Sequence, residues 1–510
     1  MTVPQRLLGP SLLCLLAVTG CVTLWRAQFA KPSDAVALDA SAPFLKAHLE
    51  SGDLYVLTQW TIDPEARVIR GEGIRYDLER RAEPRAQHTL GFDEVALVET
   101  NAPHQVVKSQ FVVMGVLTAV NVGLAAACLS SPKSCFGSCP TFYATTAGGE
   151  TIVAEGFSQA VARSLETTDV DALAGVEPAQ GVLHLTMKNE ALESHAIRRL
   201  AVLAAPRPEH GRVYRDGAHY FQGEFPAAPT ACTSAAGDCL AAVSKADALE
   251  YHSAADPADL ATRETVRLRF PRGEGPRGLL VRGRASLLTT FVLYQALAWM
   301  GTQADEWLMA LDRGGPAAAQ RLAEVGALLG DVEVWVKTAR GFERAGRFSE
   351  QGPISRDEQL VRLPDGLPAG DVELELRLTK GHWKLDQLGL VALGREVVPV
   401  ALAPSQVRRG GVADAEALRR IRGEGPRLIS NTGDVWELDF PVPGGPQDYF
   451  LEARGYYHEW IRGQWLPEQD PDKVARLFAD PGGTLRALAP AFKQVEPEID
   501  RLFEQSRIAP

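Results

Sequence analysis

The chain has 510 residues, of which 53 are Lys or Arg and 64 are Asp or Glu, so its formal net charge is −11. This length exceeds what one hydrophobic core supports, and we expect about three or four domains. The 45% hydrophobic and 23% charged residues exclude a predominantly disordered chain. An acidic balance without a basic block argues against nucleic acid as a partner.

The N-terminus has the layout of an export signal. A single Arg6 precedes an apolar run, which ends at Gly20 directly before Cys21. This resembles the bacterial lipoprotein signal, in which the chain is cut before the cysteine and lipid (diacylglycerol, palmitate) is attached there. Residues 1–20 are therefore predicted to be a lipoprotein signal peptide and Cys21 the site of lipid attachment. By the same analogy, Val22 stands where Asp would mark retention in the inner membrane. We therefore expect a lipid anchor in the outer membrane, on the periplasmic face or at the cell surface.

Short β-prone runs follow the signal. We expect residues 21–45 to form a tether that leads into a short helix near Phe44–Leu49, and residues 46–105 to form a small antiparallel β module. Within a predicted helical segment at 106–129, the stretch Phe111–Leu129 is uncharged and apolar. Its length reaches the lower limit for a membrane span. The alternative is a buried helix, which we favour because the lipid already supplies membrane attachment.

Residues 130–245 are predicted to form a second β module. Thr141–Thr146 and Thr151–Ala154 flank a Gly-Gly pair, and this arrangement is typical of a β-hairpin. The hairpin directly follows a Cys-Phe-Gly-Ser-Cys-Pro run.

Residues 246–405 are predicted to form a β-sandwich with a helical insertion at about 286–330. Alternating runs such as Val332–Lys337 and Val372–Leu378 indicate strands with one face in water and one face packed. Several such strands at intervals, joined by long loops, are typical of a sandwich.

Residues 406–510 are predicted to form a strand, Val435–Phe440, followed by a helical C-terminal region. The first of these helices would begin at Asp448 and run to Trp465, with many aromatic side chains. They would either dock the helix onto the sandwich or form a surface for a partner. The predicted fold class is thus mainly β with helical elements (α+β), with small antiparallel β modules, a β-sandwich and a helical tail.

Five cysteines follow the lipid site, and an exported protein meets an oxidising compartment. Short spacings favour two local disulfides, Cys135–Cys139 and Cys232–Cys239, which would leave Cys128 as a free thiol. The rival pairing joins Cys128 to Cys135 or Cys139. A redox function of Cys135 and Cys139 is a further alternative, although their spacing is one longer than Cys-x-x-Cys. Metal binding by Cys128, Cys135 and Cys139 would lack a fourth ligand.

One cluster of aromatic and polar residues is a candidate ligand platform. Trp383 lies between His382 and, three residues on, Asp386, and such a ring could stack on a sugar. The alternative, which we favour, places Trp383 in the core and makes Asp386 a turn cap. His195 and His210 each stand alone in polar surroundings. The sequence contains no nucleophile elbow, His-Glu-x-x-His or phosphate-binding loop, so no catalytic residue, cofactor or metal is predicted.

Three stretches resemble one group of exported bacterial proteins of unknown function. These are the motif Cys135-Phe136-Gly137-Ser138-Cys139-Pro140, the stretch Val95–Asn101 and the stretch Asn189–His195. The resemblance covers roughly residues 50–230. It implies an uncharacterised lipoprotein family of the cell envelope and supplies no catalytic residue.

Taken together, the sequence predicts a bacterial outer-membrane lipoprotein that acts as a non-enzymatic envelope or surface component. Its β-sandwich would bind a ligand or partner, such as a glycan or an envelope protein, and its N-terminal lipid would bind the membrane. One alternative is an exported hydrolase acting on envelope or environmental polymers. The other is a thiol oxidoreductase.

Overall fold

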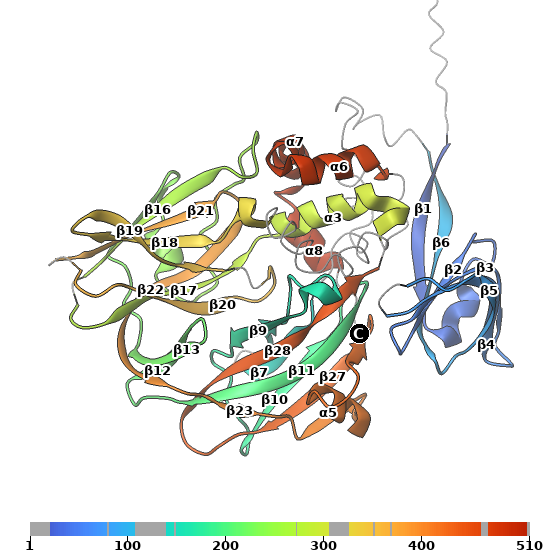
Figure 1. The fold of residues 1–510 in the computed structure, drawn as a ribbon, viewed down its shortest axis with the longest axis horizontal. Coiled ribbons are helices and arrows are strands. Elements are labelled where there is room, and N and C mark those ends of the chain that lie inside the picture. Colours follow the sequence, from blue (N-terminus) through green and yellow to red (C-terminus); the bar gives the residue numbers. More distant parts are fainter. Residues whose placement is uncertain are drawn as a thin grey trace, which may run out of the picture.

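The computed structural model describes residues 21–78, 81–107, 139–146, 149–271, 273–304, 326–349, 352–367, 370–460 and 468–506. Of these residues, 49% lie in strands and 17% in helices. The strands form five sheets whose neighbouring strands run antiparallel (Figure 1). The predicted mainly β chain with a few helices is therefore confirmed.

The N-terminal sheet has six strands in the order β1-β6-β2-β3-β4-β5. Its core consists of apolar side chains from alternate strand positions, among them Leu45, Leu57, Ile69 and Val98. The strands and the 3-10 helix η1 have these bounds: β1 Cys21–Ala30, η1 Pro32–Ala37, β2 Leu45–Leu49, β3 Leu54–Asp63, β4 Val68–Tyr76, β5 Ala86–Gly91 and β6 Val95–Val107.

The first sheet pair combines strands from the middle and the C-terminal part of the chain. One sheet has the order β25-β24-β27-β10-β7-β8, and the other has the order β23-β11-β28-β9 with β26 beside β11. Both contribute to one core. Their bounds are β7 Thr141–Thr146, β8 Gly149–Glu155, β9 Thr167–Ala172, β10 Val182–Lys188, β11 Glu193–Pro206, β23 Val400–Leu402, β24 Gln406–Arg409, β25 Val412–Ala413, β26 Leu428–Ser430, β27 Val435–Pro441 and β28 Gln447–Glu459.

The second sheet pair lies beside the first and also shares a core. Its sheets have the orders β12-β13-β22-β17-β20 and β15-β14-β16-β21-β18-β19. Side chains of β12, β13, β17, β20 and β22 meet in a small cluster of their own, which shows that the five-stranded sheet curls. The bounds are β12 Gly211–Asp216, β13 His219–Glu224, β14 Ala231–Ser234, β15 Gly237–Asp238, β16 Arg263–Phe270, β17 Arg277–Ala285, β18 Val332–Thr338, β19 Gly341–Phe348, β20 Asp357–Arg362, β21 Val372–Thr379 and β22 Trp383–Val397.

A helical layer covers one end of the two sheet pairs (Figure 1). Helix α3 is apolar around its whole circumference because it is buried among the C-terminal helices. Asp470 and Asp480 cap the first two of these helices by accepting backbone N–H groups, and a proline follows each cap. The layer consists of α3 Leu288–Met300, α6 Pro471–Ala479, α7 Pro481–Val495 and α8 Ile499–Ser506. The other helices have these bounds: η4 Arg163–Leu165, α2 Leu240–Val243, η5 Gly301–Gln303 and α5 Ala415–Ile421.

Polar contacts join the N-terminal sheet to the first sheet pair. The Arg409 guanidinium donates to Glu50 of the N-terminal sheet (2.9 Å) and to Asp434 (2.5 Å). The His48 ring stacks on the Trp460 indole, with ring centroids 3.3 Å apart. The sheet is therefore held to the rest of the chain by directional contacts as well as by packing.

Two sequence-based predictions near the N-terminus are wrong. Phe44–Leu49, predicted as a helix, contributes strand β2, which pairs with β3 and β6. The predicted tether at 21–45 contains strand β1, which pairs with β6 along its whole length. In both cases the partner strand is distant in sequence, and pairing with it overrides the local pattern.

The helix predicted from Asp448 is also wrong, because this segment is strand β28. The strand lies between β11 and β9 and is buried on both faces along most of its length. Its aromatic and apolar residues therefore show no period of two, and such a run cannot be told from a buried helix by its periodicity. Gly455 permits the close packing, since a Cβ there would lie 2.7 Å from the Ala196 carbonyl oxygen.

The predicted domain boundaries at 246 and 406 do not separate the sheets. β13, before residue 246, pairs with β22, and β11 pairs with β28, beyond residue 406. The apolar stretch 111–129 lies outside the described residues. No helix in the part that the structure describes has the length and apolar character needed to cross a membrane.

Candidate functional site

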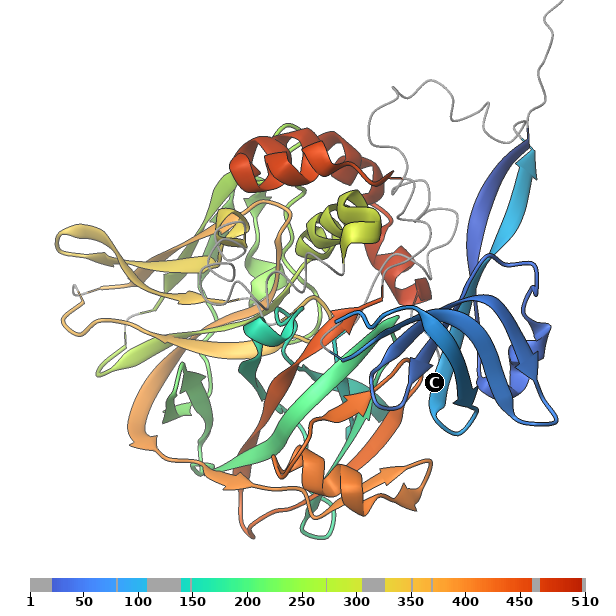
Figure 2. The same ribbon diagram turned by 45° about the vertical axis from the view of Figure 1, so that its right-hand side comes forward.

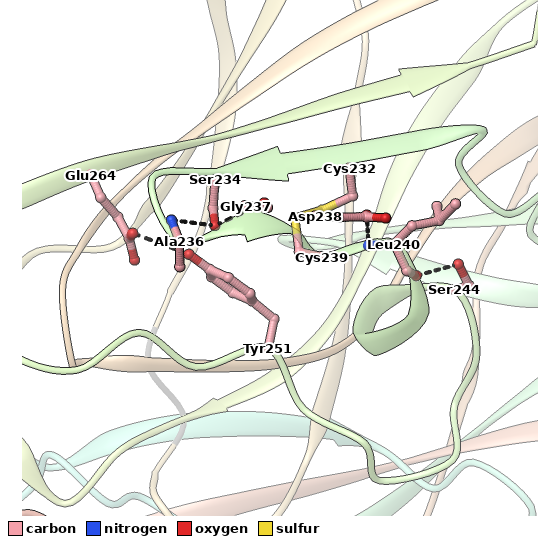
Figure 3. Close-up of a disulfide and its surroundings, with 10 residues drawn as sticks. All are labelled: Cys232, Ser234, Ala236, Gly237, Asp238, Cys239, Leu240, Ser244, Tyr251 and Glu264. Atoms are coloured by element: carbon pink, nitrogen blue, oxygen red, sulfur yellow. Dashed lines mark hydrogen bonds between the residues drawn. A yellow bond between two sulfur atoms is a disulfide. The ribbon is translucent and has the colours of Figure 1, made fainter.

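The predicted disulfide Cys232–Cys239 is formed, with the two Cα atoms 5.1 Å apart (Figure 3). It closes the β14–β15 hairpin, and the backbone N–H of Cys239 also donates to the Cys232 carbonyl (3.1 Å). Both sulfurs belong to the core of the second sheet pair. Nearby, Tyr251 donates its hydroxyl to Glu264 (3.1 Å), and burial raises the pKa of Tyr251 to about 12. This corner is a structural staple.

We expect the double substitution Cys232→Ser/Cys239→Ser to lower the free energy of unfolding by about 2–3 kcal/mol. Loss of the cross-link frees a short loop in the unfolded chain, and short loops give the smaller disulfide contributions. Calorimetry with and without a reductant measures the effect. Reductant should lower the melting temperature of the wild type to that of the double variant and leave the variant unchanged. Equal melting temperatures under all conditions would contradict the staple.

The prediction that Cys139 forms a disulfide is not borne out. Its thiol is free and buried, two residues before β7 begins. The two partners considered, Cys135 and Cys128, lie outside the described residues. Burial raises the pKa of the Cys139 thiol well above its usual value, and the nearby Glu155 and Glu193 carboxylates raise it further. The thiol therefore packs as a small core group.

The candidate platform at Trp383 is contradicted by the structure, and the favoured alternative, Trp383 in the core, is confirmed. Trp383, His382 and Asp386 are each 1% exposed, so no sugar could stack there. Trp383 packs edge-on against Phe348 in the core of the second sheet pair. Asp386 accepts a hydrogen bond from Arg282 (2.8 Å) and one from the Ala248 N–H (2.8 Å). Burial lowers the pKa of His382 to about 3, which keeps its ring neutral.

Two of the stretches that carry the family resemblance, Val95–Asn101 and Asn189–His195, come together around Trp460, which directly follows β28. The Trp460 indole N–H donates to Ser194 (3.0 Å), and its ring stacks on His48, which contacts Glu99 (3.3 Å). His195, at the start of β11, contacts Glu193 (2.6 Å) within the same buried region. A further bond joins the Tyr143 hydroxyl to Glu190 (2.8 Å). These contacts join the N-terminal sheet to the first sheet pair in a buried region, while His210 lies exposed on the surface.

Buried carboxyl groups gather where β9 meets β20. Asp171 is 1% exposed, and its pKa is raised well above the usual value by burial and by the neighbouring Asp357 and Asp169. Burial also raises the pKa of Asp169 to about 6, although the positive charge of Arg215 opposes the shift. In the described ranges, no group of three or more His, Cys, Asp or Glu residues is arranged to hold a metal ion. These carboxyl groups are therefore candidates for proton binding.

A cavity of about 400 Å³ lies between one end of the second sheet pair and the helices α7 and α8. Its charged side chains pair with one another: Lys384 with Asp500, and Lys493 with Glu496. Ser286 is also engaged, since its hydroxyl donates to the Gly381 carbonyl (2.6 Å). This cavity offers a ligand no charge that is not already matched.

A larger groove, with a volume of about 590 Å³, crosses the surface of the second sheet pair. It lies where the edge strand β19 of one sheet passes β20 of the other, and β12, β13, β17 and β22 complete its walls. A Cβ at Gly346 would lie 2.7 Å from Val361, so the glycine lets these two strands approach. Four arginines line the groove: Arg277, Arg344, Arg347 and Arg362. We call it the arginine groove.

Two of these arginines are matched by carboxylates. Arg362 donates to Asp216 (2.5 Å) and lies over the Phe221 ring, and Arg347 pairs with Asp331 (3.1 Å). By contrast, Arg277 donates to the Gly275 carbonyl (3.2 Å). Neither Arg277 nor Arg344 forms an ion pair with a described carboxylate, although the charge of Arg344 acts on the Asp331 carboxylate and opposes the rise of its pKa. The arginine groove therefore holds two guanidinium groups outside any described ion pair, in a chain whose net charge is −11.

The sequence analysis did not identify the arginine groove. Its walls come from six strands spread over 216–394, so no local motif marks it. Arg277 ends the run Arg-Gly-Glu-Gly-Pro-Arg, but only the sheet topology brings it near β19.

The comparisons with known proteins assign no family to this chain. No protein-family profile matches the chain, and no curated protein matches it. Among solved structures, a GH31 alpha-xylosidase from Xanthomonas citri is 9% identical with a TM-score of 0.15, over 85% of this chain and 38% of that one. The secreted serine protease VesC from Vibrio cholerae is 7% identical with a TM-score of 0.14, over 73% of this chain and 99% of that one. Likenesses this weak carry no argument about fold or function.

Proposed function

We propose that the chain is an exported, lipid-anchored protein of the bacterial outer membrane that binds a ligand or partner without catalysis. The observation that carries this proposal is the position of Cys21 in the fold. Cys21 begins β1 and pairs with Val107, the last residue of β6. The predicted lipid site is therefore fixed at one end of a strand pair.

That end projects from the N-terminal sheet. β1 pairs with β6 over Val98–Val107, whereas β2 reaches only Val95–Thr100 of the same strand. Beyond Thr100 the two strands continue as a two-stranded ribbon (Figure 2). A ribbon of this kind suits a spacer that holds the folded body away from a lipid surface.

A second apolar signal begins at the same place. The run Phe111–Leu129 starts four residues after Val107, the register partner of Cys21. Cys21 and the start of this run, whose less favoured interpretation is a membrane span, thus adjoin one tip of the ribbon. The lipid site at this tip supports the proposal that the tip faces the membrane and the sheet pairs face away from it.

The second sheet pair supports the ligand-binding part of the proposal. Its two sheets share one core, as in a β-sandwich, and it carries the arginine groove. The Cys232–Cys239 disulfide fits an exported protein. A thiol oxidoreductase is less well supported, because its reactive thiol needs a lowered pKa, and that of Cys139 is raised.

We expect Cys21→Ala to abolish labelling by radioactive palmitate and to reduce the membrane-bound fraction more than about ten-fold, since the acyl chains supply the anchoring energy. Fractionation of cells expressing the full chain measures this. Cys14→Ala, which changes a cysteine inside the predicted signal, is the matched control and should stay in the membrane. An unlabelled wild type would refute lipid attachment. A labelled wild type whose Cys21→Ala variant stays fully in the membrane would show that another segment anchors the chain.

A further inference from the structure

We propose that the arginine groove is a binding site for a short acidic oligosaccharide, that is, a sugar chain carrying carboxylate groups. This inference rests on the ligand-binding part of the proposed function and names its ligand class, and it does not depend on lipid attachment. It starts from Arg277 and Arg344, which line the groove without a described carboxylate partner.

The unmatched guanidinium groups indicate an acid group in the ligand. A guanidinium presents a planar fork of donors that matches a carboxylate with two parallel hydrogen bonds. Arg277 leads into β17 from a Gly-Pro turn, and Arg344 lies on β19, so the two approach from different sheets. A carboxylate held between them would form the close ion pairs that no described carboxylate forms with either arginine.

The remaining groups of the groove indicate hydroxyls in the same ligand. The lining also contains the carboxylates of Asp365 and Glu343, of which Glu343 also pairs with Arg340 (2.8 Å). A ligand that carried only negative charge would be repelled by them, whereas sugar hydroxyls can donate hydrogen bonds to them. Pro276, Leu363 and Leu393 add apolar surface to the lining, which suits the apolar faces of sugar rings. A ligand with both acid and hydroxyl groups could therefore bind the arginines and the carboxylates of the groove at the same time.

The volume of the groove and the net charge of the chain limit the ligand to a short oligomer. A volume of about 590 Å³ is far more than one small ion fills and falls in the range of sites for small organic ligands. A long, densely charged polyanion would be repelled by a chain of net charge −11. A short oligomer with spaced acid groups fits both limits.

The test is calorimetric titration of the full mature chain with three probes: a galacturonate tetramer, a neutral galactose tetramer and inorganic phosphate. We expect the galacturonate tetramer to bind at least about ten-fold more tightly than the neutral tetramer, and to bind more weakly as salt is raised. Equal binding of the two tetramers, or no binding of the acidic one at millimolar concentration, would overturn the proposal. Phosphate binding as tightly as the acidic tetramer would show an ion site only and would equally overturn it.

Matched variants locate the site. Arg277→Gln/Arg344→Gln should weaken binding of the acidic tetramer at least about ten-fold. Arg267→Gln/Arg269→Gln removes the same charge from exposed positions of β16 outside the groove and should leave the affinity within about two-fold. An equal loss in both double variants would mean that only net charge matters, and the proposal would fail. All four positions are on the surface or only partly buried, and the buried Glu375 keeps Arg377 as its partner when Arg267 is replaced. We therefore expect folding to be preserved, and each variant's melting curve verifies this.

Discussion

Trp383→Ala should lower the free energy of unfolding by about 3–5 kcal/mol, the range for truncating a large buried aromatic side chain. Trp383 is 1% exposed at the start of β22. Its ring packs edge-on against Phe348 of the facing sheet, with centroids 5.4 Å apart. Its indole N–H donates to the Gly330 carbonyl (3.3 Å). Truncation would leave a cavity between the two sheets and an unpaired carbonyl group.

Urea denaturation followed by circular dichroism measures this loss. Trp335→Ala is the control, because Trp335 lies half-buried on β18 with Arg377 stacked over its ring at 3.9 Å. We expect a loss of under about 2 kcal/mol there, since a partly exposed side chain forfeits less packing. If Trp383→Ala were as stable as the wild type and lost only ligand binding, Trp383 would be a surface platform after all.

The contrast between strands β18 and β28 shows what the sequence can predict. Val332–Lys337 alternates in sequence, and strand β18 has the expected alternation of buried and exposed side chains. The local alternation reports directly which face is packed. Strand β28 lies between two strands and is buried on both faces along most of its length, so it has no such alternation, and its aromatic run was interpreted as a helix.

Which strands pair with one another could not be predicted from the local sequence pattern, for a different reason. β11 pairs with β28, about 250 residues later in the chain, and β1 pairs with β6. Such partners are chosen by the packing of the whole chain, and no short stretch of sequence records them. The arginine groove follows from the same long-range pairing. The Cys232–Cys239 disulfide was predictable because a seven-residue separation brings the two cysteines together within one hairpin.

Raising the pH from about 5 to about 8 should destabilise the protein, and Glu155 should account for a large part of the change. Glu155 ends β8 and is 1% exposed. Burial raises its pKa to about 7, against the opposing effect of two backbone N–H donors, those of Ile354 and Ser355. The charge of Arg284 and the Cys139 thiol oppose the shift as well. The folded chain therefore holds a proton on Glu155 at a pH where the unfolded chain has released it.

The sign of the effect follows from proton binding. Between about pH 4.5, the ordinary value, and about pH 7 the folded state binds more protons than the unfolded state, so stability falls as pH rises. The stabilisation is complete below that window and is lost above it. A shift of this size corresponds to roughly 3 kcal/mol. Asp169, with a pKa of about 6, and Asp171 act in the same direction. Carboxylates with lowered pKa values, such as Glu358, lose their contribution only at more acidic pH.

The variant Glu155→Gln isolates this contribution. Glutamine retains an oxygen that can accept the N–H groups of Ile354 and Ser355 but cannot ionise. Its midpoint of urea unfolding should therefore fall less between pH 5 and pH 8 than that of the wild type. Glu150→Gln is the control on the same strand, because Glu150 is half-exposed and pairs with Lys188, and its pH dependence should match that of the wild type. Parallel pH curves for the wild type and Glu155→Gln would show that Glu155 is ionised in the folded state, which requires water or a cation to reach the buried carboxylate.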